Sequence, residues 1–354
     1  MTLALEWAAK ASATAAPNPR VGCVLVKKGV LIGAGHTQPA GQAHAEVAAL
    51  ADAAARGCDV RGATAYVTLE PCSHHGRTAP CADALIGAGV ARVVSAIADP
   101  NPLVAGQGLA RLHAAGITVT TDMMATQAYE MNIGFFSRMR RGKPWVRLKV
   151  AASLDGKTAL HNGQSQWITG AAARDDGHAW RARAGVVITG IGTVQSDNPQ
   201  LTVRAMALPH QPRRVVLDSR LQIDPEARVL QGDVCWIITA RPDMAKQAAL
   251  QAHGHEVLCL PDSAGKVDLP GLMRELGRRQ INEVHVEAGY RLNGALISAG
   301  CVDELLVYLA PGLLGDARGM FDLPVLVNLG DQRRLKFEQI TQIGDDMRIL
   351  ARFS

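Results

Sequence analysis

The stretch TLEPCSHHGRTAPC, residues 68–81, lies between a segment with the pattern of a strand and a segment with the pattern of a helix. Residues 63–69, which lead into it, are mostly apolar and predict a buried strand. Residues 82–88, which follow it, predict a short helix that stops at Gly89. A strand, a polar loop and a helix in this order are typical of an α/β fold.

The same alternation continues on both sides of this stretch. Further strands are predicted at 21–27, 30–36, 91–97 and 117–120, and further helices at 3–13, 43–56, 108–115 and 125–140. This pattern predicts an N-terminal α/β/α sandwich with helices on both faces of the sheet. The segment Arg141-Gly142-Lys143-Pro144 stops it, so we predict one domain over 1–143 and a second over 144–354.

The second domain shows its own α/β pattern. Strands are predicted at 145–152, 185–189, 214–218, 234–239, 256–260, 283–287 and 304–310, and 335–343 with 346–353 predict an antiparallel pair. Two glycine-containing motifs in the second domain begin like phosphate-binding loops, but each lacks a residue that such a loop requires. Gln195 replaces the third glycine of a dinucleotide-binding motif, and Ala295 replaces the lysine that a P-loop needs.

Composition narrows the class of protein. Of the 354 residues, 48% are hydrophobic and 19% charged, which is enough to build sizeable cores. Aromatic residues make up only 4%, which counts against a protein that stacks many bases. The net charge of +5 fits small anionic ligands but is too weak to predict a nucleic-acid track. Without a secretory signal or a run of about 18 apolar residues, we expect a cytoplasmic location.

The strongest chemical signal is His44 with Glu46 two residues later, followed by Cys72 and Cys81. One imidazole and two thiolates suit tetrahedral zinc, with the fourth position left open for a reacting water. Glu46 need not be a ligand, and its carboxylate can carry protons. A structural zinc site with four protein ligands is the alternative, with His74 or His75 as the fourth. The five other cysteines are predicted to be packing residues.

The segments PNPRVGC (17–23), HAE (44–46) and TLEPCSHHGRTAPC (68–81) resemble the deaminase domain of the bifunctional riboflavin-biosynthesis deaminase/reductase family. The long gap between the two cysteines is that family's own form of a site that is shorter in nucleic-acid deaminases. The resemblance implies a cytidine-deaminase-like fold. It implies zinc ligands His44, Cys72 and Cys81, Glu46 as proton shuttle, and a substrate pocket lined by Asn18, His74, His75 and Arg77.

The segments 149–159, 165–170, 190–204, 217–219 and 286–289 occur in the order of the reductase domain of the same family, which they resemble. The resemblance implies a dihydrofolate-reductase-like α/β fold that uses NADPH. Implied cofactor contacts are Ala151, Trp167, Thr193, Asp197, Ser219 and the loop Gly289, Tyr290, Arg291, Leu292, Asn293, Gly294 and Ala295. Implied substrate contacts are Ser165, Arg181, Leu201, Arg204 and Glu287, with Lys149 near the reaction centre.

Both domains together imply two consecutive steps of riboflavin biosynthesis. Zinc-dependent deamination of 2,5-diamino-6-(ribosylamino)pyrimidinone 5′-phosphate would precede NADPH-dependent reduction of its ribosyl group to ribityl. We therefore expect small phosphorylated pyrimidines as partners, with no nucleic acid and no membrane. The two α/β domains could also pair with a second copy as a homo-oligomer. The alternatives are a tRNA deaminase with an accessory domain and a non-enzymatic, zinc-stabilised binding module.

Overall fold

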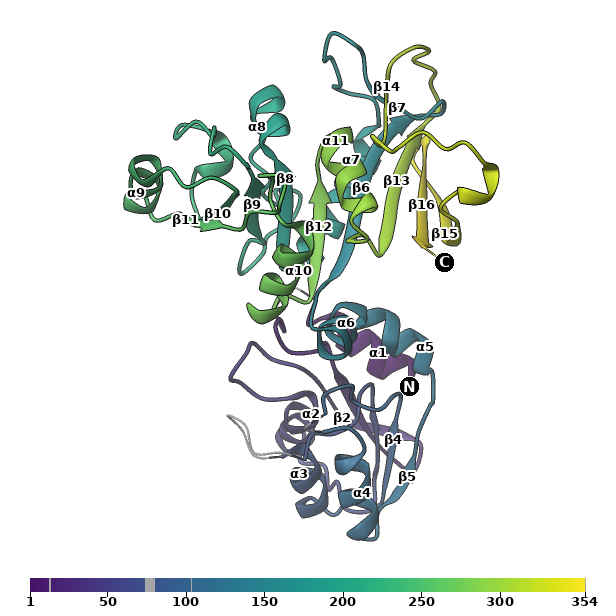
Figure 1. Ribbon diagram of the computed structural model, residues 1–354. Coiled ribbons are helices and arrows are strands. Elements are labelled where there is room, and N and C mark those ends of the chain that lie inside the picture. The colour runs from purple at the N-terminus through teal and green to yellow at the C-terminus, as the bar shows by residue number, and fades with distance from the viewer. Residues whose placement is uncertain (13, 74–79, 103, 354) are drawn as a thin grey trace. The chain divides into compact units, whose positions relative to one another are not determined.

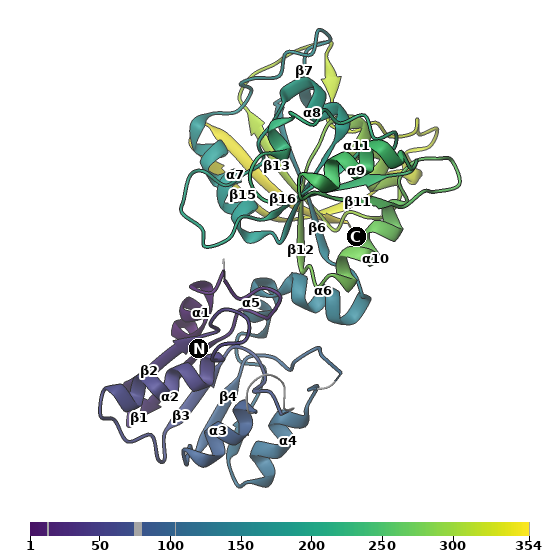
Figure 2. The ribbon, with the colours of Figure 1, turned by 90° about the vertical axis from the view of Figure 1, so that its left-hand side faces the viewer.

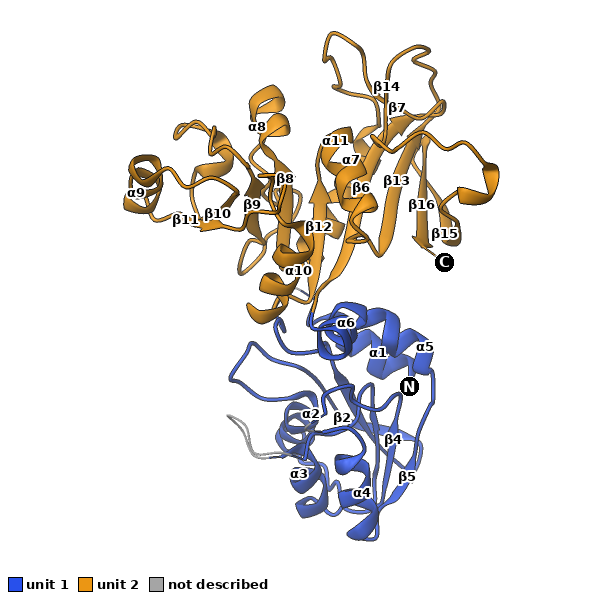
Figure 3. Ribbon diagram, in the orientation of Figure 1, with its two compact units in different colours: residues 1–142 blue, residues 143–354 orange. Residues whose placement is uncertain are grey.

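The computed structural model describes residues 1–12, 14–73, 80–102 and 104–353, drawn in Figure 1. The chain forms two compact units, Met1–Gly142 and Lys143–Ser354 (Figure 3). Each unit has its own sheet and its own hydrophobic core. No helix within the described residues is both long and apolar enough to span a membrane.

The first unit is built on a five-stranded sheet with the strand order β2-β1-β3-β4-β5. The β1 strand is antiparallel to β2 and β3, whereas β3, β4 and β5 run parallel. The strands are β1 (Gly22–Lys27), β2 (Val30–His36), β3 (Thr64–Val67), β4 (Arg92–Ser95) and β5 (Thr118–Thr120). The helices are α1 (Thr2–Ala9), α2 (Ala45–Ala55), α3 (Cys81–Gly87), α4 (Gln107–Ala114), α5 (Ala125–Met131) and α6 (Ile133–Arg141).

Small residues let α1 and α2 approach the sheet closely from opposite faces. Gly35 of β2 lies so near α2 that a Cβ atom would come 2.4 Å from the backbone nitrogen of Ala49. Gly22 of β1 lies even closer to α1, where the Cβ would come 1.9 Å from the carbonyl oxygen of Ala4. The close contact of Gly35 with α2 fixes the position of α2, and the start of this helix carries part of the metal centre.

The single helix predicted over 125–140 is wrong in one respect, because the chain breaks it into α5 and α6 at Asn132. The side-chain oxygen of Asn132 accepts the N–H of Arg20 at 2.8 Å, and its amide donates to the Arg20 carbonyl at 2.9 Å. A long-range bond of this kind leaves no periodic trace in the sequence.

The second unit is built on a nine-stranded sheet with the order β11-β10-β9-β8-β12-β6-β13-β16-β15. It is parallel from β11 to β13 and antiparallel beyond, and β7 and β14 form a separate small pair. The strands are β6 (Trp145–Ser153), β7 (Lys157–Ala159), β8 (Val186–Gly190), β9 (Arg213–Leu217), β10 (Cys235–Thr239), β11 (Glu256–Cys259), β12 (Glu283–Glu287), β13 (Glu304–Ala310), β14 (Arg318–Gly319), β15 (Leu335–Ile343) and β16 (Asp346–Phe353). The helices are α7 (Ala171–Arg183), α8 (Ile191–Asp197), α9 (Met244–Ala252), α10 (Leu269–Arg278) and α11 (Tyr290–Ser298), with 3-10 turns at Arg228–Leu230 and Leu329–Asp331.

The mixed α/β fold predicted in two parts is confirmed, including the antiparallel pair at 335–343 and 346–353. Two parallel strands of the second unit lead directly into helices. Gly190 ends β8 and caps α8, and Gly289 follows β12 and caps α11. Ligands of open α/β sheets bind at such carboxyl ends. Cys259, predicted as a packing residue, is instead exposed at the end of β11.

Candidate metal centre and nucleotide cleft

Three residues far apart in the sequence place their ligand atoms together in the first unit. His44 caps α2, Cys81 is the first residue of α3, and Cys72 lies in the loop after β3. Their ligand atoms all lie within 4.8 Å of one another. The Nδ1 atom of His44 is 3.6 Å from the Cys72 sulfur and 3.3 Å from the Cys81 sulfur. A tetrahedral zinc site separates its nitrogen and sulfur ligands by about 3.5 Å, so the trio fits zinc.

Glu46 lies in the first turn of α2 beside this trio and is buried. Burial and the negative charge of Cys72 raise the pKa of Glu46 to about 7. Hydrogen bonds from Cys81 and His44 lower the pKa of Cys72, which favours the thiolate form that binds metal. The centre thus joins two sulfur ligands, one imidazole and one carboxylate that is free to handle protons.

Of the other predicted pocket residues of the first unit, the structure describes only Asn18. Asn18 is half-buried between two prolines, and its N–H closes a turn on the carbonyl of Ala15 at 2.8 Å. His74, His75 and Arg77 lie outside the described residues. The positions of His74 and His75 therefore do not decide whether the fourth zinc ligand is a histidine or a water.

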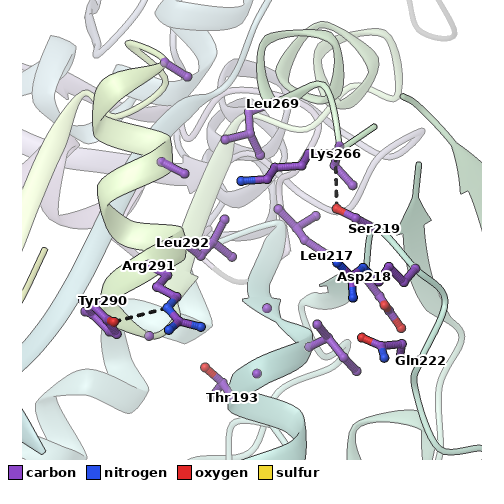
Figure 4. Close-up of a pocket in the computed structure, with 18 of the residues that line it drawn as sticks. Thr193, Leu217, Asp218, Ser219, Gln222, Lys266, Leu269, Tyr290, Arg291 and Leu292 are labelled. Carbon is purple, nitrogen blue, oxygen red and sulfur yellow. Dashed lines mark hydrogen bonds between the residues drawn. The ribbon is translucent and has the colours of Figure 1, made fainter. Parts of the chain in front are cut away.

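A cleft of about 960 Å³ opens in the second unit at the carboxyl ends of β8, β9 and β12 (Figure 4). Several predicted cofactor contacts line it, and they come from three separate segments of the chain. They are Thr193 of α8, Ser219 after β9, and Gly289, Tyr290, Arg291, Leu292 and Ala295 at the start of α11. The backbone N–H groups of two helix N-termini are therefore available to a pyrophosphate.

Not every predicted cofactor contact lies on this cleft. Asn293 and Gly294 face the segment 320–322, where a Cβ atom on Gly294 would come 2.0 Å from the carbonyl oxygen of Asp322. Asp197 ends α8 and Ala151 lies on β6, and neither is among the residues that line the cleft. Asn293 and Gly294 therefore pack α11 against the segment 320–322.

The cleft also contains residues that the sequence did not predict. Figure 4 shows the Lys266 side chain extending over the cleft from the hairpin that follows β11. This hairpin is tied to β9 because the N–H of Val267 donates to the Ser219 hydroxyl at 3.2 Å. Arg220, Gln222 and Arg318 also line the cleft. A single lysine in a turn gives no sequence signal of a binding role. Arg220 follows a parallel strand closely, and that position could have indicated that it lines the cleft.

A second, smaller cavity of about 430 Å³ contains Ser165 and Trp167, together with the segment 310–314. Trp167 is 71% exposed, which excludes a role as a core residue. The guanidinium of Arg174 lies 4.6 Å from the centre of its ring. Ser165 and Trp167, predicted for substrate and cofactor, thus share one cavity.

Charged residues gather between β6, β12 and α7. Arg181 binds Glu287 through two hydrogen bonds of 2.6 and 2.9 Å, and its third nitrogen donates to the Thr202 carbonyl at 2.6 Å. Lys149 lies opposite Glu287 in the strand register. Burial alone would raise the pKa of Glu287, but the positive charges of Arg181 and Lys149 hold it well below its usual range. Burial lowers the pKa of Lys149, and Glu287 opposes that effect.

The two remaining predicted substrate residues differ in exposure. Arg204 is exposed, and its guanidinium reaches the Thr202 hydroxyl at 3.4 Å. The side chain of Leu201 is buried in the core of the second unit, with its backbone at a positive φ of 56°. Leu201 could therefore meet a substrate only through its backbone, while Arg204 offers an exposed cation.

Comparison with known proteins identifies both units. The family of the cytidine and deoxycytidylate deaminase zinc-binding region matches residues 1–97, and the RibD C-terminal domain family matches residues 144–349. The riboflavin biosynthesis protein RibD of Escherichia coli K12 is 48% identical over 98% of this chain and 96% of its own. The chain belongs to the RibD family. The RibD of Haemophilus influenzae is 45% identical over 99% of this chain and 95% of its own.

Solved RibD structures agree over the full length. Acinetobacter baumannii RibD in its crystal form 1 superposes with a TM-score of 0.90 at 42% identity, covering 100% of this chain and 97% of that one. A Thermotoga maritima protein described as a diaminohydroxyphosphoribosylaminopyrimidine deaminase/5-amino-6-(5-phosphoribosylamino)uracil reductase gives 0.89 at 31% identity, covering 100% and 97%. This member of the RibD family is thus a bifunctional deaminase and reductase of riboflavin biosynthesis, with a zinc-binding deaminase domain and a reductase domain.

Proposed function

We propose that residues 1–143 deaminate 2,5-diamino-6-(ribosylamino)pyrimidinone 5′-phosphate and that residues 144–354 reduce the product with NADPH. The proposal is supported above all by the trio His44, Cys72 and Cys81 with Glu46 beside it. The Thermotoga maritima relative is described by the same two activities, deaminase and reductase. The division of the chain into compact units after Gly142 supports the boundary.

In the deaminase, water is consumed and the exocyclic amino group leaves as ammonia. Zinc supplies Lewis-acid activation of the hydrolytic water when it is held by the trio. Glu46 is placed to accept a proton at its carboxylate and to return it to the leaving amino group. Its position in the first turn of α2, two residues after the metal ligand His44, keeps both roles on one rigid element.

In the reductase, the cofactor supplies the reducing equivalents and the protein supplies orientation. The N-termini of α8 and α11 are placed to hold the pyrophosphate of NADPH, with Lys266 and Arg220 as cations on the same cleft. Arg204 is exposed and can bind the substrate phosphate, because guanidinium groups match phosphate oxygens. Arg181 instead holds Glu287, so we assign it to the shape of the substrate site.

The decisive experiment incubates the protein with the diamino-pyrimidine phosphate, with and without NADPH, and follows ammonia and NADPH oxidation separately. We expect ammonia in both reactions and NADPH oxidation only after deamination. NADPH oxidation without ammonia, or neither signal, would reject the proposed order of reactions. Deamination of tRNA in place of the pyrimidine would favour a nucleic-acid deaminase, and unfolding on zinc removal would favour a structural zinc module.

Two finer points of partner and location belong to the same proposal. The β15 strand lies at the open edge of the nine-stranded sheet and exposes Phe337 and Ile340. An open edge can pair with its own copy about a two-fold axis, which supports a homodimer. Sedimentation of Phe337→Asp against the unmodified protein tests it, since an unchanged mass would reject this interface. All seven cysteines are free thiols, which a reducing compartment preserves, and this supports the cytoplasm.

A further inference from the structure

A buried carboxylate lies two residues before the metal ligand Cys72. Glu70 is 3% exposed, and both of its oxygens accept backbone N–H groups. The Oε2 atom accepts from Asp99 at 3.1 Å and from Gly106 at 2.9 Å. The Oε1 atom accepts from Gly108 at 2.9 Å and from Leu109 at 3.3 Å. A carboxylate offers about four acceptor positions, so these four bonds occupy them all.

These bonds fasten the chain before Cys72 to the start of α4. Gly108 also packs closely against this segment, because a Cβ atom there would come 1.9 Å from the carbonyl oxygen of Pro71. The N–H of Glu70 also donates to the carbonyl of Ile97 at 3.0 Å. The dipeptide Glu70-Pro71 is therefore fixed between the end of β4 and the first turn of α4.

Cys72 depends on this fastening more than the other two ligands do. His44 and Cys81 lie at the starts of helices, whereas Cys72 belongs to neither a helix nor a strand. Its sulfur accepts the N–H of Cys81 at 3.3 Å, and its carbonyl accepts the N–H of Ala82 at 3.1 Å. These contacts hold Cys72 from the side of α3, so the opposite side is held through Glu70.

The α4 helix is in turn braced against α3, which lies beside it (Figure 2). Arg111 of α4 forms an ion pair of 2.6 Å with Asp83 of α3 and donates to the carbonyl of Ser73 at 3.4 Å. The residues on both sides of Cys72 are thus connected to α4: Glu70 through the first turn of the helix, and Ser73 through Arg111.

We propose that Glu70 is a positioning residue that holds the Cys72 sulfur at the metal by fixing its backbone to residues 99–109. This inference rests on the zinc site of the proposed function. Groups that hold metal ligands in place typically change metal affinity or activity by about 10- to 100-fold when they are replaced.

The variant Glu70→Gln has the same shape but turns an NH₂ group toward two backbone N–H donors. We expect zinc release to a chromogenic chelator to accelerate by about 10- to 100-fold, with a similar loss of deamination and unchanged reduction of supplied deaminated substrate. Asp52→Asn is the matched control. Asp52 also accepts a backbone N–H, that of Ala34 at 2.8 Å, but it lies farther along α2. We expect this variant to release zinc at the unmodified rate.

A second variant, Gly108→Ala, changes no charged group, but its added Cβ would come 1.9 Å from the Pro71 carbonyl oxygen and 3.2 Å from the Oε1 atom of Glu70, so it displaces this segment. It is expected to accelerate zinc release as well, and it decides the matter if Glu70→Gln fails to fold. Zinc release at the unmodified rate in a folded Glu70→Gln or Gly108→Ala protein would overturn the inference, as would equal acceleration in Asp52→Asn. If the unmodified protein bound no zinc at all, the proposed function itself would fail.

Discussion

The two sites of this protein are assembled in contrasting ways. The metal centre takes His44, Cys72 and Cys81 from one short stretch of the chain, residues 44–81, and places them at two helix starts and one loop. The nucleotide cleft takes its lining from segments between Gly190 and Arg318, at the ends of three strands. Metal ligation needs particular side-chain atoms, whereas a nucleotide is held largely by backbone N–H groups and shape. The first site can therefore be recognised from its residue types and their spacing, whereas residues of the second were predicted only through the resemblance to a family.

The sharpest way to separate the two sites is Glu46→Gln. The substitution removes the carboxylate that carries protons and leaves the three ligands in place, so deamination should fall by about 10²- to 10⁴-fold. Reduction of supplied deaminated substrate should stay close to the unmodified rate, measured as NADPH oxidation. A parallel fall of both activities in a folded protein would contradict two independent sites.

The reciprocal change is Glu287→Gln in the second unit. It leaves Arg181 and Lys149 without their common negative partner, and breaking a buried ion pair typically costs about 3–5 kcal/mol. We expect kcat/KM for reduction to fall by about 10- to 100-fold, since the substrate site loses its charge balance. Ammonia release, measured on the same samples, should not change. A loss of ammonia release would show that the two sites are coupled.

A pH prediction concerns the charged layer beside the reductase site. His285 is fully buried, and among the described residues its ring nitrogens make no hydrogen bond, although Nε2 lies 3.5 Å from a carboxylate oxygen of Glu287. Burial lowers the pKa of His285 from 6.5 to about 3, and the positive charges of Arg147, Arg181 and Lys149 add to this against the opposing charge of Glu287. As the pH falls below 6.5, His285 becomes protonated in the unfolded chain but stays neutral in the folded chain.

Stability from neutral His285 is therefore complete above about pH 7 and declines as the pH falls toward 3. At about pH 5 the loss amounts to about 2 kcal/mol, because roughly 1.5 pH units correspond to that free energy. His285→Leu should lose about 2 kcal/mol less than the unmodified protein between about pH 7.5 and about pH 5, measured by denaturant unfolding. Identical pH dependence of the two proteins would contradict a buried neutral imidazole.

The smallest expected effect tests the nucleotide cleft. Lys266→Ala removes one cation, so affinity for adenosine 2′,5′-diphosphate should weaken about three- to tenfold in calorimetric titration. Lys246→Ala is the control, because Lys246 lies on α9 and is not among the residues that line the cleft. Equal affinities in all three proteins would show that Lys266 does not face the bound phosphate.

The metal trio was predicted from sequence because one imidazole and two thiolates form a donor set that suits zinc, and because the surrounding segments resemble a deaminase family. The break at Asn132 and the clamp at Glu70 were not predicted. Both depend on hydrogen bonds to backbone atoms far along the chain, from Arg20 in one case and residues 99–109 in the other. Backbone donors exist at every residue except proline, so the sequence does not tell which of them a side chain will meet.

The amino-acid order was enough to predict the two α/β patterns, most of the strand positions and the candidate metal-binding trio, since hydrophobic periodicity and ligand chemistry are local properties. Tertiary structure alone decided that Arg181 binds Glu287, that Gly294 packs against Asp322 rather than facing the cleft, and that Lys266 extends over it. These outcomes follow from strand order and helix packing. Strand order brings Arg181 and Glu287, which are 106 positions apart, to within 2.6 Å, and no local pattern encodes that distance.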